Sequence, residues 1–297
     1  METQIKKLDY ERPDEKVIAE AGRIILAGGL VAFPTETVYG LGGDALNPES
    51  SKKIYAAKGR PSDNPLIVHI ADKEDLYRIA RTVPEKAEKL MEAFWPGPLT
   101  MIFDKNELVP GETTGGLDTV AVRMPSDRIA AAFIKAAGGF VAAPSANVSG
   151  RPSTTTAAHV AEDLSGRIEM ILDGGQAVIG LESTIVDMTV DPPVILRPGA
   201  VTKEMMEEQI GAVEVDKAMI APDSGIRPKA PGMKIPSLCA ESGSDHRGGT
   251  HRGCNGGDKT HGRGNHEPGE KGRDHCDRRD CLLLSRRTRH EPGRQKA

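Results

Sequence analysis

Apolar residues in about the first 200 positions follow two spacings, one typical of amphipathic helices and one typical of buried strands. From Asp14 to Gly28 the apolar residues lie three and four positions apart, which predicts a helix that ends at Gly28-Gly29. Further helices are predicted at 50–57, 73–81, 84–95, 127–137 and 157–164. Short apolar runs predict strands at 30–34, 66–71, 99–103, 120–124, 140–143, 170–172, 184–186 and 194–196. This alternation predicts one α/β domain.

The alternation covers about 200 residues, and the chain becomes linker-like from about Asp216. Residues 213–234 are rich in Pro and Gly, a composition typical of a linker. Residues 235–297 hold eleven glycines, no aromatic residue and one apolar cluster at Leu282–Leu284. Such a composition does not bury enough apolar surface to build a core, so we expect this tail to be disordered.

Residues 1–234, the main body, differ from residues 235–297 in net charge and in cysteine content. The formal net charge is −4, but residues 235–297 carry 13 Lys and Arg against 9 Asp and Glu. All four cysteines and six of the eight histidines lie there too, without paired zinc-ligand spacing. The main body therefore has no thiol nucleophile and no disulfide framework. No apolar run is long enough to cross a membrane and the N-terminal sequence is charged, so we expect a cytoplasmic protein without a membrane segment.

Hydroxyl groups follow the first predicted strand. Thr35 and Thr37 precede Gly40, Gly42 and Gly43, which we interpret as a glycine-punctuated turn that permits close backbone approach. Strand ends of α/β sheets are common ligand sites, and threonine hydroxyls hydrogen-bond small polar substrates. An ordinary strand exit with turn-forming residues explains the segment equally well.

Cations follow the second predicted helix. Lys58 and Arg60 suit phosphate oxygens, although basic residues at a helix end also complement the helix dipole. His69 ends an apolar strand, where a buried structural histidine is the simpler interpretation. Arg123 lies inside another apolar strand, so it needs an anionic partner, which is either a protein carboxylate or a ligand.

Small polar residues follow two later strands. Ser145, Asn147 and Ser153 come before a helix, where hydroxyls and free amides favour phosphate but also serve as ordinary caps. Ser183 and Arg197 lie beside Gly or Pro at strand edges, and a surface ion pair is the simple alternative for Arg197. No phosphate-binding P-loop and no Rossmann glycine motif occurs, so any nucleotide site is of another type.

Seven segments of the chain occur in an order that matches a known family. They are PTETVYGLG, KGRPSDNPLIVHI, WPGPLT, VAVRMP, APSANVSG, ESTIVD and ILRPGA. Together they resemble the YrdC/YwlC family of L-threonylcarbamoyladenylate synthases over about residues 10–212. The resemblance implies a twisted open α/β sheet with flanking helices and a deep, positively lined cavity.

The resemblance also implies a role for individual residues. By motif match, threonine is expected at Thr37, His69, Arg123, Ala143 and Ser183. ATP is expected at Lys58, Arg60, Asn64, Thr119, Ser145, Asn147, Ser153 and Arg197. Arg123 is the expected partner of the threonine carboxylate.

The implied reaction converts L-threonine, bicarbonate and ATP to L-threonylcarbamoyladenylate and pyrophosphate. A carbamate formed from threonine and bicarbonate attacks the α-phosphate, so positioning and charge neutralisation suffice without a protein nucleophile. Mg²⁺ is expected to enter with ATP and to bridge its phosphates. The product would pass to the transferase machinery that modifies the adenosine beside the tRNA anticodon, and binding of RNA, double-stranded RNA included, is a further expectation.

The tail departs from the family pattern after Lys234. Longer members continue with a linker resembling Tyr-Arg-His-Tyr-Ala-Pro-Lys-Ala and a second small domain, whereas this chain continues with Ile235 to Ser242. One codon set for these eight residues, read with its first nucleotide removed, encodes the family's linker. We therefore expect residues 235–297 to be an out-of-frame replacement of the second domain. A genuine basic extension that binds RNA is the alternative.

Two other functions fit parts of the sequence. A non-catalytic RNA-binding or ribosome-assembly module would use the same concave surface and predicts salt-sensitive RNA affinity. The carbamoyl-transfer domain of hydrogenase maturation factors is related, but such proteins embed it among zinc-finger and acylphosphatase segments, and this sequence contains neither.

Overall fold

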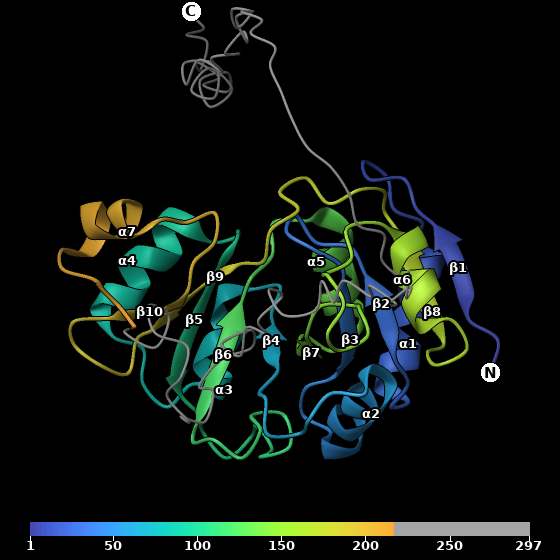
Figure 1. The fold of residues 1–297 in the computed structure, drawn as a ribbon, viewed down its shortest axis with the longest axis horizontal. Coiled ribbons are helices and arrows are strands. Elements are labelled where there is room, and N and C mark those ends of the chain that lie inside the picture. Colours follow the sequence, from blue (N-terminus) through green and yellow to red (C-terminus); the bar gives the residue numbers. More distant parts are fainter. Residues whose placement is uncertain (217–297) are drawn as a thin grey trace, which may run out of the picture. The chain divides into compact units, whose positions relative to one another are not determined.

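The computed structural model describes residues 1–216, which form one mixed sheet with helices on both faces (Figure 1). The predicted linker beyond residue 216 and the predicted tail 235–297 lie outside the described residues. The strands are β1 Gln4–Lys7, β2 Val31–Phe33, β3 Gly40–Asp44, β4 Ile67–His69, β5 Leu99–Asp104, β6 Thr119–Arg123, β7 Val141–Ala143, β8 Met170–Asp173, β9 Thr184–Asp187, β10 Val194–Arg197 and β11 Glu214–Val215. The helices are α1 Glu15–Leu26, α2 Pro48–Lys58, α3 Leu76–Ile79, α4 Glu85–Phe94, α5 Arg128–Ala136, α6 Ala157–Leu164 and α7 Lys203–Ile210.

Local sequence explains where the helices begin and end. Asp14 caps α1 because its side chain accepts the backbone N–H of Lys16 at 2.8 Å. In α2, Asn47 is the N-cap and Pro48 occupies the first helical turn, where its missing N–H costs nothing. Gly59 ends α2 with a left-handed backbone, φ 62°. This stop fixes the position of Lys58 at the last turn of the helix.

The sheet runs in the order β1-β8-β2-β3-β7-β4-β6-β5-β9-β10-β11. Strands β4 and β6 are parallel neighbours, and their register places His69 opposite Arg123. Strand β7 pairs antiparallel with β4 and places Ala143 opposite Ile67. The centre of the sheet therefore brings residues from three separate motifs onto one face, because directly paired residues of neighbouring strands share a face.

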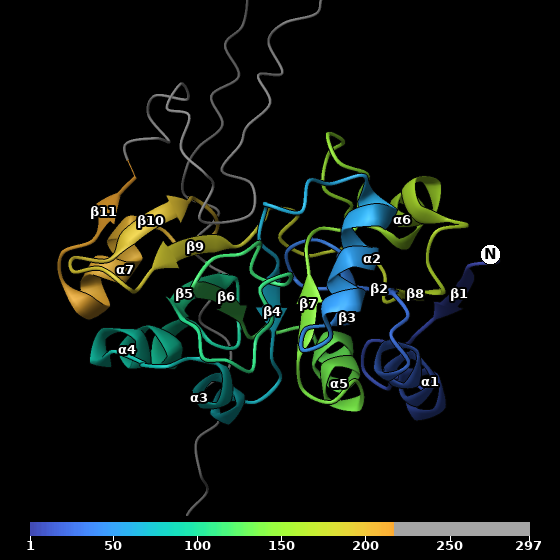
Figure 2. The ribbon, with the colours of Figure 1, turned by 90° about the horizontal axis from the view of Figure 1, so that it is seen from below.

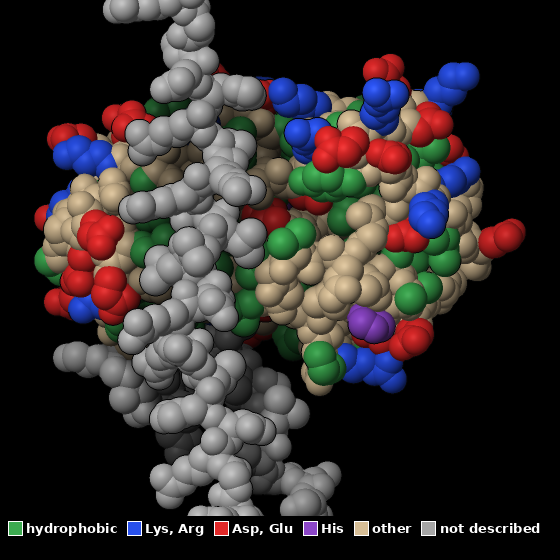
Figure 3. Space-filling model, turned by 90° about the horizontal axis from the view of Figure 1, so that it is seen from above, with side chains coloured by type: hydrophobic (Ala, Val, Ile, Leu, Met, Phe, Trp, Pro, Cys, Tyr) green, Lys and Arg blue, Asp and Glu red, His purple; other side chains and the backbone are tan. Residues whose placement is uncertain are grey.

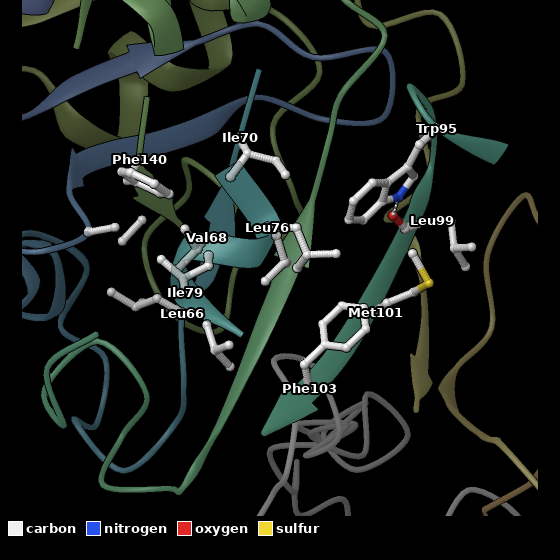
Figure 4. Packing of buried hydrophobic residues seen from close by; sticks show 14 of the residues in the cluster. Leu66, Val68, Ile70, Leu76, Ile79, Trp95, Leu99, Met101, Phe103 and Phe140 are labelled. Atoms are coloured by element: carbon white, nitrogen blue, oxygen red, sulfur yellow. Dashed lines mark hydrogen bonds between the residues drawn. The ribbon is translucent and has the colours of Figure 1, made fainter. Parts of the chain in front are cut away.

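Two apolar layers cover the sheet. On one face, α1 and α5 lie side by side and contribute Ile25 and Phe133 to a core with Phe33 of β2 (Figure 2). On the other face, side chains from α2, α3, α4 and α6 pack with alternate residues of the central strands. Figure 4 shows part of this larger core, where the Trp95 indole donates to the Leu99 carbonyl at 2.7 Å. Successive side chains of a strand point to opposite faces, so a sheet that is covered on both faces needs apolar residues at successive positions.

The predicted α/β fold class, with its twisted open sheet and flanking helices, is confirmed. Every strand predicted from the apolar runs is present, and the predicted helices recur within a few residues of their bounds. The helix predicted at 73–81 is shorter, because a 3₁₀ turn at Lys73–Asp75 leads into α3 and Ala80 already bridges to Lys105.

The glycine-punctuated turn predicted at Gly40, Gly42 and Gly43 is wrong, because these residues belong to strand β3. A Cβ on Gly42 would lie 2.9 Å from Val141 and 3.2 Å from the Phe33 ring, so this glycine makes room for neighbouring strands instead of bending the chain. The sheet also reaches beyond the predicted bounds 10–212, since β1 pairs with β8 and β11 pairs with β10. The predictions did not include β1, β3, β11 or α7.

Acidic and basic side chains are interspersed on the face of the molecule seen in Figure 3. Among residues 1–216, no helix combines the length and the apolar character that a membrane span requires. Helix α4 packs against α7 near β10, at the opposite end of the sheet from α1, β1 and β8 (Figure 1).

Candidate active site

A cavity of about 440 Å³ collects polar residues from the strand ends and loops at the centre of the sheet. Its volume lies within the usual range for small-molecule sites. All but one of the predicted site residues line it: Thr37, Lys58, Arg60, Asn64, His69, Arg123, Ala143, Ser145, Asn147, Ser153, Ser183 and Arg197. Thr119 is the exception, because it lies half-buried at the start of β6, at the other end of that strand from Arg123.

Thr37 follows β2 in a turn that its neighbour Thr35 organises. The Thr35 hydroxyl donates to the Val38 carbonyl at 2.6 Å and accepts the backbone N–H groups of Thr37 and Val38. The two threonine hydroxyls are 2.9 Å apart. This side-chain turn holds a fully buried hydroxyl, that of Thr37, at the cavity wall.

His69 is buried at the end of β4, with its Nδ1 atom 3.2 Å from the Ile67 carbonyl and its ring edge-on to Phe33. Burial, and secondarily the nearby charge of Arg123, lower the pKa of His69 to about 3. The imidazole is therefore neutral near pH 7. It is both the buried histidine that the sequence suggested and a part of the cavity lining.

Arg123 has a protein partner that the sequence left unidentified. Its Nη2 atom lies 2.8 Å from Oε1 of Glu36, and the two side chains are 4% and 10% exposed. Its Nε donates to the Gly97 carbonyl at 3.3 Å. Thus Glu36 already balances the charge of Arg123 from within the protein, while the guanidinium still borders the cavity.

Lys58 crosses from the end of α2 to the loop that follows β7. Its Nζ donates to the backbone carbonyls of Ser145 and Asn147 and lies 3.4 Å from the Asn147 side-chain oxygen. Burial, followed by the charge of Arg60, lowers the pKa of Lys58 to about 7, although the charges of Glu182 and Asp163 act in the opposite direction. Lys58 therefore fixes the Ser145–Asn147 loop, a function beyond complementing the helix dipole.

Arg60 and Asn64 carry buried polar atoms that lack hydrogen-bond partners. The Arg60 Nη2 atom donates to the Pro65 carbonyl at 3.1 Å, but its Nε has no partner, and neither does Oδ1 of Asn64. Both residues line the cavity. Buried polar groups are normally satisfied, so these two atoms favour a polar ligand at this position.

Ser183 and Arg197 lie together at the end of the cavity formed by β9 and β10. Arg197 donates from Nε to the Ser183 carbonyl at 3.0 Å and from Nη2 to the Ser183 hydroxyl at 3.1 Å. The same hydroxyl is 2.8 Å from that of Thr100. Arg197 is mostly buried, so its ion pair is not the surface pair that the sequence offered as an alternative.

Glu182 and Glu36 were not among the predicted site residues. Glu182 accepts the Ser153 hydroxyl at 2.8 Å and lies 2.6 Å from Nη1 of Arg197. Ser153 therefore bonds a side chain, whereas Thr156 supplies the predicted cap of α6 by accepting the His159 N–H. Each acid directly adjoins a predicted residue, Thr37 or Ser183, which was the signal available in the sequence.

A family model described as telomere recombination, named for Sua5, YciO and YrdC, matches residues 23–199. The chain belongs to the Sua5/YciO/YrdC family. The resemblance found in the seven sequence motifs is thereby confirmed.

Members of the Sua5/YciO/YrdC family with curated names are close to this chain in sequence. The threonylcarbamoyl-AMP synthase of Pyrococcus abyssi is 54% identical over 224 residues, which are 75% of this chain and 66% of the relative. That of Bacillus subtilis is 53% identical over 218 residues, which are 73% of this chain and 62% of the relative. The chain thus spans less than two thirds of the length of each.

A solved structure of the family matches the fold. The crystal structure of P. abyssi Sua5 complexed with L-threonine has a TM-score of 0.76 and 53% sequence identity, over 78% of this chain and 68% of that one.

Proposed function

We propose that this chain makes L-threonylcarbamoyladenylate and pyrophosphate from L-threonine, bicarbonate and ATP, the first step in forming threonylcarbamoyladenosine in tRNA. The observation that carries the proposal is the composition of the cavity. The Thr37 hydroxyl and the His69 imidazole line the same cavity as the cations Lys58, Arg60 and Arg197. One part suits a small amino acid and the other a triphosphate. The names of the relatives and the threonine complex of P. abyssi Sua5 support the same assignment.

In the proposed reaction, the threonine amine and bicarbonate condense to a carbamate with loss of water. A carbamate oxygen attacks the α-phosphorus of ATP, the bond to the bridging oxygen breaks, and pyrophosphate leaves. The protein holds the reactants in line and neutralises phosphate charge, so no side chain needs to form a covalent bond. Buried cations are effective here because the cavity lowers the local dielectric constant.

We assign threonine to Thr37, His69, Arg123, Ala143 and Ser183, and the nucleotide to Lys58, Arg60, Asn64, Ser145, Asn147, Ser153 and Arg197. With its Nδ1 donating to the Ile67 carbonyl, neutral His69 has an acceptor at Nε2, which suits a hydrogen bond from a hydroxyl. Arg123, oriented by Glu36, is the partner of the threonine carboxylate. The unsatisfied Arg60 Nε and Asn64 Oδ1 atoms support a polar ligand near them.

Mg²⁺ enters this proposal together with ATP. Within residues 1–216 no group of three or more His, Cys, Asp or Glu side chains has the arrangement of a metal site. Magnesium in nucleotide sites keeps several waters and is bound largely through the substrate's phosphate oxygens, so we assign it no ligand from the protein. When bound, the ion would neutralise charge on the leaving pyrophosphate.

The product would pass to the transferase that modifies the tRNA, and the cytoplasm, where ATP and tRNA are present, is the expected location. Direct RNA binding is a separate expectation. It predicts an RNA affinity that falls as the salt concentration rises.

The test is pyrophosphate release from ATP, measured with this chain beside a version corrected by one nucleotide after Lys234. Release that requires both threonine and bicarbonate supports the proposal, and each omission is the internal control. If only the corrected chain works, the altered tail has functional consequences. If neither releases pyrophosphate while both are folded, the enzymatic proposal is wrong and the RNA-binding module is the better interpretation.

A matched pair of variants tests the threonine assignment. Thr37→Val keeps the side-chain shape, removes the hydroxyl, and should raise the KM for threonine with little change in the KM for ATP. Thr189→Val removes a hydroxyl that contacts Asp187 outside the cavity lining and should change neither constant. Equal behaviour of the two variants would contradict the assignment of Thr37.

A further inference from the structure

Glu182 is the one acidic residue in the cavity lining that residues 1–216 provide. It lies in the loop before β9, directly ahead of Ser183. Its side chain is 32% exposed, so it remains accessible from the cavity. The proposed ligand of this cavity is an anion, which a carboxylate repels. The presence of Glu182 among the cations therefore needs a physical explanation.

Both carboxylate oxygens of Glu182 accept hydrogen bonds from groups that would otherwise donate to the nucleotide. Oε1 accepts the Ser153 hydroxyl at 2.8 Å, and Oε2 lies 2.6 Å from Nη1 of Arg197. Ser153 and Arg197 are both assigned to ATP in the proposed function. Carboxylate and phosphate oxygens accept the same hydroxyl and guanidinium donors, so the two anions compete for them.

The charge of Glu182 also acts on two further cations of the cavity. Burial lowers the pKa of Lys58, Arg60 lowers it further, and Glu182 opposes both. Burial is likewise the main influence lowering the pKa of Arg60, and Tyr55 and Glu182 oppose it. Glu182 therefore offsets part of the free-energy cost of keeping these buried cations charged without a ligand.

We propose that Glu182 is an internal counter-anion that occupies part of the triphosphate subsite, and that ATP displaces it from Ser153 and Arg197 on binding. This inference rests on the proposed function. Because displacement costs two charge-assisted hydrogen bonds, Glu182 weakens nucleotide binding. After the reaction, the same carboxylate competes with pyrophosphate for Arg197 and so promotes product release.

The substitution Glu182→Gln tests this, because it keeps the hydrogen-bonding shape and removes the charge. Titration calorimetry of ATP in EDTA should give a Kd on the order of tenfold lower for E182Q than for the wild type. Pyrophosphate should bind more tightly by a similar factor and become a stronger product inhibitor. Glu207→Gln removes the same charge in α7, where Glu207 pairs with Lys203, and should leave both affinities within about twofold.

The direction in which E182Q changes the affinity for ATP distinguishes the possible roles of Glu182. If Glu182 only holds Arg197 in position, E182Q binds ATP more weakly or equally, which overturns the inference. If Glu182 is chiefly a magnesium ligand, E182Q loses affinity only when Mg²⁺ is present, which also overturns it. A folded wild type that binds no ATP overturns the proposed function as well, so that the two failures are distinguishable. Should E182Q fold poorly, Glu182→Asp shortens the reach to Arg197 and is expected to tighten ATP binding to a lesser degree.

Discussion

The guanidinium of Arg123 and the carboxylate of Glu36 form a buried ion pair, with Nη2 and Oε1 2.8 Å apart. These two atoms do not form a hydrogen bond, so the attraction between them is mainly coulombic. The pair joins the turn after β2 to the end of β6, two segments that are far apart in sequence. It fixes an arginine at the cavity wall before any substrate binds.

Removing the negative partner should therefore be costly. Glu36→Gln leaves the buried charge of Arg123 without its counter-charge, and we expect the free energy of unfolding to fall by about 3 kcal/mol. Urea denaturation measures this directly. Glu11→Gln breaks an ion pair with Arg128 whose side chains are 71% and 61% exposed, and should cost less than about 1 kcal/mol.

The same variants separate stability from function. E36Q should also raise the KM for threonine more than the KM for ATP, because Arg123 would no longer be held toward the threonine subsite. An E36Q protein as stable as E11Q would contradict the importance of the pair. Equal effects on both substrates would indicate a general structural defect.

Gly199 packs against backbone that carries the cavity residues. A Cβ at this position would lie 2.5 Å from the Thr184 nitrogen and 2.7 Å from the Glu182 carbonyl oxygen. Because neither backbone atom moves easily, Gly199→Ala should lower the free energy of unfolding by roughly 1 to 3 kcal/mol. At Gly111 a Cβ meets nothing within 4 Å, so Gly111→Ala should be neutral or slightly stabilising. Thermal or urea unfolding of the two variants checks the contrast.

Lys58 should make nucleotide binding depend on pH. Burial, followed by the charge of Arg60, lowers its pKa to about 7, so the positive charge present below pH 7 is lost progressively above it. We expect the Kd for ATP to rise several-fold between pH 7 and pH 9. In Lys58→Met the affinity should be lower at pH 7 and should change little over the same range. A wild-type affinity that is constant over this range would contradict the prediction.

The sequence predicted most of the sheet because buried strands and amphipathic helices impose periods that are visible without a structure. Strand β3 was not predicted because Gly40, Gly42 and Gly43 carry no apolar side chain. A Cβ on Gly40 or Gly42 would crowd Phe33 of the neighbouring strand, and one on Gly43 would crowd Ile54 of α2. Two-residue β11 is defined by pairing with β10 and has no period of its own. Tertiary packing, absent from a local pattern, decided both cases.

The sequence predicted the residues that line the candidate site more completely than the contacts among them. Motif resemblance identified residues that converge from β4, β6, β7 and β10, which no local spacing would bring together. It did not identify Glu36 or Glu182, because the need for each acid arises only when Arg123 and Arg197 are buried beside it. A buried arginine signals that an acid is required without naming which one.

The buried imidazole of His69 should make the free energy of unfolding depend on pH. Its pKa is lowered to about 3 in the folded protein, first by burial and then by Arg123, against about 6.5 in an unfolded chain. Between these values the unfolded state binds the additional proton, so stability is complete above about pH 6.5 and is lost as the pH falls toward 3. One such proton contributes a slope of up to about 1.4 kcal/mol per pH unit.

Replacing His69 with Asn should remove this contribution while retaining a group that bonds the Ile67 carbonyl. Between pH 6.5 and 4.5, urea unfolding should show the wild type losing roughly 2 to 3 kcal/mol more than His69→Asn. His159 is exposed on α6, so His159→Asn should retain the wild-type slope. If His69→Asn and the wild type lose stability in parallel, the imidazole titrates normally in the folded state. A normal pKa would mean that His69 is hydrated instead of buried, and the neutral hydrogen-bonding role assigned to it would have to be given up.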